Sequence, residues 1–93
     1  MSGQTTFKVV EPEFQHELFS RLLHAAAVGT TATFEAVSED DPREQPERHN
    51  FTVRVKTVHF ELPCAFDVTD QDMNIFQIKL FKGDRPTFTV FYH

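Results

Sequence analysis

Only one segment of the chain has the periodicity of an amphipathic helix, and the other apolar segments have the pattern of strands. Between residues 12 and 28 the apolar side chains recur every three or four positions, so they share one face at about 100° per residue. Pro12 suits the first position of a helix, and Gly29 is a typical terminator. A single helix of this length covers one face of a small sheet and leaves the other uncovered.

Strand patterns are predicted at residues 5–10, 30–37, 51–62, 75–81 and 87–92. The fold class is therefore α+β: one N-terminal helix packed on a four- to five-stranded antiparallel sheet, in the order β-α-β-β-β-β. The apolar phase of 51–62 switches near Lys56, which predicts a β-bulge there. Residues 64–74 are interpreted as a connection, with Ala65, Phe66 and Val68 as apolar anchors. The last two strands are predicted to pair as a hairpin around 82–86, where Gly83 supplies a positive φ.

The C-terminal strands are apolar on both faces, which is more than one helix can cover. Residues 76, 78 and 80 alternate with Ile75 and Phe81, and residues 88, 90 and 92 alternate with Phe91. Either the sheet curls on itself, or segment 64–74 covers the second face, or a partner does. The residues predicted to form an interface are Ile75, Phe81 and Phe91, together with Phe19 and Leu23 at the edge of the helical stripe.

Acidic residues are concentrated in the first half of the chain. The formal net charge is −5, and residues 1–50 carry nine acidic and four basic side chains, whereas residues 51–93 carry five of each. Segment 38–50 contains no apolar side chain and is expected to be a solvated, mobile loop. Its residues Glu39, Asp40 and Asp41 are expected to steer a basic partner. The net charge argues against nucleic-acid binding, although Arg54, Lys56, Lys79, Lys82 and Arg85 could form a small basic platform.

The setting expected for this chain, a single domain over residues 1–93, is the cytoplasm. Cys64 is the one cysteine, so no intramolecular disulfide can form. Residues 1–6 are polar and show no secretion signal. The longest apolar run, residues 25–28, is too short to cross a membrane, so no membrane partner is expected.

Candidate catalytic and metal sites are weak. His59 and Cys64 lack the paired spacing of zinc ligands, and His49 is no closer in sequence. Histidines 16 and 24 lie about 12 Å apart along a helix, too far to share an ion. Aspartates 67, 70 and 72 lack the spacing of a calcium loop and are interpreted as turn residues. Three glycines cannot build a phosphate-binding loop. No metal and no cofactor are expected.

The sequence favours a non-enzymatic protein–protein interaction module, such as a small inhibitor or adaptor, acting through an exposed sheet face or edge and the acidic loop. The expected partner is another protein, either one with a basic surface or a second copy in a homodimer. The alternative is a small enzyme or ligand-binding protein with a pocket between helix and sheet, for which Cys64, His59 and Glu61 are the residues to test.

Overall fold

The protein consists of one helix and six strands in the computed structural model, which describes residues 3–81, 83 and 85–92. The expected helix on an antiparallel sheet is confirmed, but the number of strands was underestimated. In chain order the elements are β1 (Gly3–Glu11), α1 (Gln15–Val28), β2 (Thr31–Ser38), β3 (Arg48–His59), β4 (Cys64–Asp70), β5 (Ile75–Leu80) and β6 (Thr87–Tyr92).

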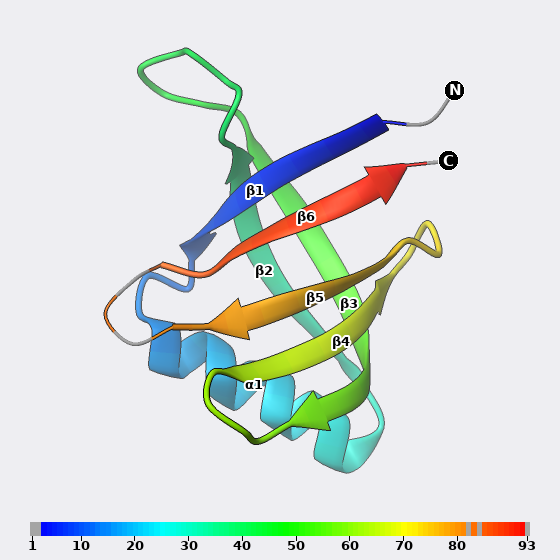
Figure 1. Cartoon of the computed structure of the whole chain (residues 1–93). Coiled ribbons are helices and arrows are strands. Elements are labelled where there is room, and N and C mark those ends of the chain that lie inside the picture. Colours follow the sequence, from blue (N-terminus) through cyan, green and yellow to red (C-terminus); the bar gives the residue numbers. More distant parts are fainter. Residues whose placement is uncertain (1–2, 82, 84, 93) are drawn as a thin grey trace.

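The six strands form one antiparallel sheet in the order β5-β4-β3-β2-β1-β6. The sheet curls until its two edge strands, β5 and β6, lie side by side, so the molecule is a nearly closed barrel with α1 packed on β2 and β3 (Figure 1). One face of the sheet therefore becomes the interior of the barrel. Of the three expected ways to cover the second face, the curling of the sheet on itself is the one that the structure shows for the inner face (Figure 1).

β4 is the strand that the sequence pattern missed. It occupies Cys64–Asp70, where a connection was expected, and pairs with both β3 and β5. The predicted anchors Ala65, Phe66 and Val68 are all buried. Pro63 and the aspartates at 67, 70 and 72 look like turn signals, but only Asp70 and Asp72 lie at the turn that follows the strand.

The predicted hairpin between the last two strands is wrong. β6 pairs with β1 instead, from Gly3↔Tyr92 to Lys8↔Thr87, and β5 pairs with β4. Gly83 does have the expected positive φ, 87°. Two other residues of the expected turn, Lys82 and Asp84, lie outside the described residues.

The helix is shorter at its start than the pattern indicated. Phe14 has extended dihedral angles (φ −100°, ψ 135°) and serves as the N-cap, so the helix begins at Gln15 rather than near Pro12. It ends as predicted, because Gly29 adopts the left-handed conformation (φ 71°) and its amide donates to the carbonyl of Ala25. Leu18, Leu22 and Ala25 are buried, whereas Phe14 and Val28, at the ends of the apolar stripe, are exposed.

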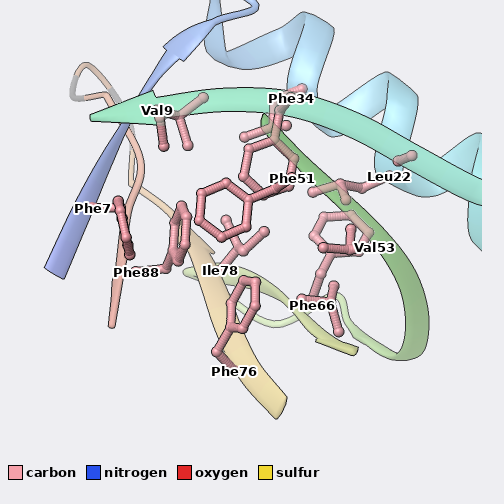
Figure 2. Close-up of a cluster of buried hydrophobic side chains, with 14 of the residues drawn as sticks. Phe7, Val9, Leu22, Phe34, Phe51, Val53, Phe66, Phe76, Ile78 and Phe88 are labelled. Atoms are coloured by element: carbon pink, nitrogen blue, oxygen red, sulfur yellow. The ribbon is translucent and has the colours of Figure 1, made fainter. Parts of the chain in front are cut away.

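Phenylalanine rings fill the interior (Figure 2). Phe88 of β6 lies 4.8 Å from Phe76 of β5 in a stacked arrangement, and 5.1 Å from Phe51 of β3 edge-on, measured between ring centroids. Phe7 and Phe34 are each 5.5 Å from the same ring. Stacking between Phe76 and Phe88 therefore joins the two edge strands inside the barrel.

β3 contains the predicted bulge. The register with β4 shifts between Val55 and Thr57, which places the extra residue at Lys56. The strand begins at Arg48 and ends at His59, and both ends differ from the expected 51–62. Phe60 and Leu62 lie beyond its end and are exposed, because no strand face carries them into the core.

Candidate functional site

The edge of β5 that faces β6 carries unpaired backbone groups. The amide of Asp70 donates to the carbonyl of Asn74, which fixes the phase of the β4–β5 ladder. Backbone groups alternate along an antiparallel strand, so the N–H and C=O groups of Ile75, Gln77 and Lys79 point away from β4 and towards the gap.

The edge of β6 that faces β5 also carries unpaired backbone groups. The amide of Val9 donates to the carbonyl of Pro86, and the register then directs the backbone groups of Thr87, Thr89 and Phe91 away from β1. Among the described residues, no backbone hydrogen bond joins β5 to β6. We call this gap, between residues 75–80 of β5 and residues 87–92 of β6, the seam.

Bulky apolar side chains stand at the seam. Ile75, Phe81 and Phe91 are 61%, 50% and 56% exposed. Together with Phe76 and Phe88 they line a groove of about 520 Å³ along the seam. Ile75 and Phe91 are exposed because strand side chains alternate, and their neighbours Phe76 and Val90 already fill the interior.

Among the described residues, the charged side chains that line the two hollows along and beside the seam are basic. Lys79 lines the first groove, and a second hollow of about 420 Å³, which shares Phe81 with the first, is lined by Lys8 and Arg85. No described acidic residue lines either hollow. The described lining of these two hollows is therefore apolar and positive, although the whole chain has a net charge of −5. At the Tyr92 end of the seam, Asp70 and Asp72 supply negative charge.

A separate apolar pocket lies where the start of the helix meets β4 and the end of β5. It measures about 620 Å³ and is lined by Phe14, Phe19, Leu62, Cys64 and Leu80. The remaining lining residues are Glu13, Gln15, His16, Gly83 and Arg85. We call this the helix-end pocket.

Cys64 and His59 are not brought together. His59 Nε2 lies 2.7 Å from Asp67 Oδ2, and Gln77 Nε2 donates to Asp67 Oδ1 at 2.8 Å. These two hydrogen bonds hold the pKa of Asp67 below its ordinary value. Cys64 shares the inner face of the sheet with Phe66 and packs against the core, whereas His59 contacts Asp67 on the outer face, so the thiol and the imidazole lie on opposite faces of the sheet. Glu61 is exposed and does not line the helix-end pocket.

Asp41 organises the acidic loop rather than facing solvent freely. Its two carboxylate oxygens accept hydrogen bonds from Arg43 Nε (2.9 Å) and Arg43 Nη2 (2.6 Å), and also from the amides of Arg43 and Glu47. Hydrogen bonds from Arg43 hold the pKa of Asp41 far below its ordinary range. The bonds from the Arg43 side chain have the larger effect, and the bond from its backbone amide has the smaller one. Glu39 and Asp40 are exposed.

Phe19 and Leu23, predicted as contacts beyond the sheet, are half-buried and pack against the core. The ring of Phe19 meets Phe66 edge-on at 5.7 Å. Phe19 also lines the helix-end pocket, whereas Leu23 does not. The core therefore supplies part of their cover.

The aspartates and His49 have structural roles. Asp70 Oδ1 accepts hydrogen bonds from the amides of Asp72 and Asn74, which is the turn-forming role that was predicted. His49 packs edge-on against Phe7 at 5.4 Å. In residues 3–81, 83 and 85–92, no three His, Cys, Asp or Glu side chains are placed to hold a metal ion.

The basic residues weighed as a nucleic-acid platform are divided between several places. Arg54 donates from Nη1 to the carbonyl of Gly29 at 3.1 Å, and Lys56 lies exposed at the bulge. Lys79 lines the groove along the seam, Arg85 lines the neighbouring hollow, and Lys82 is outside the described residues.

In comparisons with known proteins, no family model matches the chain, and no curated protein or solved structure matches it significantly. Within the part of the chain that the structure describes, no helix has the length and hydropathy needed to cross a membrane.

Proposed function

We propose that this protein is a non-enzymatic protein-binding module, of the inhibitor or adaptor type, that captures an extended segment of another protein along the seam. The observation that carries the proposal is that β5 and β6 face each other as the two edges of the sheet. Among the described residues, the N–H and C=O groups that these strands direct into the seam form no hydrogen bonds with the other strand. An exposed edge offers a ladder of hydrogen bonds to an added strand. The segment pairs with the β5 edge alone, because the Phe76–Phe88 stack holds β5 and β6 too close together for a strand that pairs with both edges.

The exposed side chains supply what an added strand needs beyond backbone pairing. In strand addition, main-chain hydrogen bonds supply affinity, and pockets for alternate side chains supply specificity. Ile75, Phe81 and Phe91 give the seam an apolar rim of the kind that marks interfaces. The groove that these residues help to line is large enough to receive one or two bulky side chains.

The charge of the seam favours a segment that carries acidic residues. Among the described residues, the charged side chains in the lining of the two hollows are Lys79, Lys8 and Arg85, so an acidic side chain on the incoming strand meets positive charge there. The partner segment is therefore extended, with bulky apolar residues alternating with acidic or polar ones. Glu39 and Asp40 of the loop steer a basic region elsewhere on the same partner.

A selection from random peptides displayed on phage tests the proposal, with the purified chain as bait. We expect the enriched peptides to alternate bulky apolar residues with acidic ones. Strand addition is tested with Gln77→Pro, which removes a seam-facing N–H at an edge position where proline is tolerated. Gln77→Ala is the matched control, because it keeps the N–H and also loses the bond to Asp67. The proline variant should weaken peptide binding at least about fivefold relative to the alanine variant, since one hydrogen bond contributes about 1 kcal/mol.

The role of positive charge in binding acidic peptides is tested with Lys79→Glu. Lys56→Glu is the matched control, because it makes the same change of charge at the bulge, away from the seam lining. Only the Lys79→Glu variant should bind the acidic peptides more weakly than the wild type. Unchanged circular dichroism of all four variants is the control for folding. A selection that enriches no peptide, or equal binding by the Gln77→Pro and Gln77→Ala variants, would contradict capture by strand addition.

A further inference from the structure

The β3–β4 connection, Phe60-Glu61-Leu62-Pro63, forms an apolar tip with no cover. Leu62 is 96% exposed and Phe60 is 69% exposed. Both residues lie between the end of β3 at His59 and the start of β4 at Cys64, so neither belongs to a strand face. An almost fully exposed leucine at the end of a tight connection is a protrusion that can enter a partner's pocket.

The helix-end pocket lies directly beside this tip. Leu62 itself helps to line this pocket, together with its chain neighbour Cys64 and with Phe14 and Phe19 of the helical segment. The molecule therefore presents an apolar protrusion and an apolar hollow in one continuous patch. A two-fold symmetric interface uses the same patch on both subunits, so it requires a surface that is complementary to itself.

We propose that the occupant of the helix-end pocket is the Phe60–Pro63 tip of a second copy of this chain, in a two-fold symmetric homodimer. Leu62 of each copy enters the pocket of the other, against Phe14, Phe19 and Leu80. Phe60 extends the contact beside it. The exchange is reciprocal, so it closes at two copies and does not propagate into a filament.

The exposed apolar area is of the size that such an interface needs. A fully buried aromatic side chain accounts for roughly 150–250 Å². Phe60 and Phe14, at 69% and 55% exposure, together offer roughly 200–300 Å², and Leu62, at 96% exposure, adds nearly the whole of its side chain. A standard interface buries about 800 Å² per partner, and about 65% of this area is apolar in homodimers, so these three residues supply a large part of the apolar area required.

Charge is also compatible with this occupant. Glu61 is the charged residue of the tip, and Arg85 lies at the rim of the pocket. Arg85 donates from Nη1 to the carbonyls of Val9 and Val10 at 3.4 and 3.3 Å, which holds the guanidinium against the barrel. Glu13 lines the same pocket and opposes Glu61, so the apolar contact, not the ion pair, is the main contribution to affinity.

Sedimentation velocity over a wide range of protein concentration tests the dimer. The wild-type chain should shift from monomer to dimer as concentration rises, and Leu62→Glu should raise the dissociation constant at least about tenfold. Met73→Glu is the matched control. It also places a glutamate at an exposed apolar position, but in the β4–β5 turn at the opposite end of these strands. It should dimerise like the wild type.

The reactivity of Cys64 locates the contact. In the dimer, alkylation of Cys64 by iodoacetamide should slow as the wild-type concentration rises and should not depend on concentration in the Leu62→Glu variant. A wild-type chain that stays monomeric, a Leu62→Glu variant that dimerises normally, or species larger than a dimer would each overturn the proposal. So would a small molecule retained at this pocket in native mass spectra of the monomer, because the occupant would then be a ligand.

Discussion

Replacing Phe88 by leucine should destabilise the barrel by about 1–3 kcal/mol, although leucine nearly conserves the apolar volume. Four other phenylalanine rings lie within 5.5 Å of this 3% exposed ring, measured between centroids. Each aromatic pair contributes about 0.5–1.5 kcal/mol beyond area burial, and these contributions are not additive. A volume-conserving swap alone usually costs less than 1.5 kcal/mol. A chain of 93 residues has a free energy of unfolding of roughly 5–14 kcal/mol, so the variant should still fold.

Urea unfolding of Phe88→Leu and Phe91→Leu compares the two faces of the same strand. With a slope of roughly 1–3 kcal/mol/M, a loss of about 2 kcal/mol lowers the midpoint of the Phe88→Leu variant by about 1 M. Phe91 is 56% exposed, so its replacement should change the free energy of unfolding by no more than about 0.5 kcal/mol. Equal midpoints for the two variants would refute the assignment of Phe88 to the interior and Phe91 to the surface.

Two further predictions concern the helix end and the acidic loop. Gly29→Ala should lower the free energy of unfolding by about 1 kcal/mol and the melting temperature by about 4–8 °C. The cost comes from the positive φ of 71° and not from a clash, because no atom lies within 4 Å of an added Cβ. An unchanged melting temperature would contradict the left-handed cap. In an NMR titration, the pKa of Asp41 should lie well below its ordinary value and rise towards it in Arg43→Ala. Because the folded pKa is the lower one, this carboxylate stabilises the loop at neutral pH, and the contribution is lost as pH falls through the folded pKa. A normal pKa in the wild type would show that the Asp41–Arg43 pair does not form.

Local patterns predicted those parts of the fold that depend on neighbouring residues. The helical stripe, the Gly29 terminator, the Lys56 bulge and the positive φ of Gly83 are each fixed within a few residues of chain. Pairing of strands far apart in sequence has no such local signal. The pattern therefore paired β5 with β6 through the intervening turn, whereas the structure pairs β6 with β1, whose partner residues lie 79 to 89 positions away in the sequence.

The candidate sites show the same division. Alternation along the last strands correctly separates interior residues such as Phe76 and Val90 from the exposed Ile75 and Phe91. The seam could not be predicted, because it exists only when the sheet curls and brings its two edges together. The role of Asp41 was missed because it depends on Arg43 folding back onto the carboxylate. The available signal was an acidic and a basic residue two positions apart, Asp41 and Arg43, on either side of a proline. The charge pattern alone predicts only a solvated loop.

Amide hydrogen exchange along β5 and β6 tests the open seam most directly. The account predicts alternating protection: slow exchange at residues 76, 78, 88 and 90, whose N–H groups face β4 or β1, and fast exchange at residues 77, 79, 89 and 91, whose N–H groups face the seam. Uniform protection on both strands would mean that β5 and β6 pair with each other, and a closed barrel would leave no edge for a partner strand.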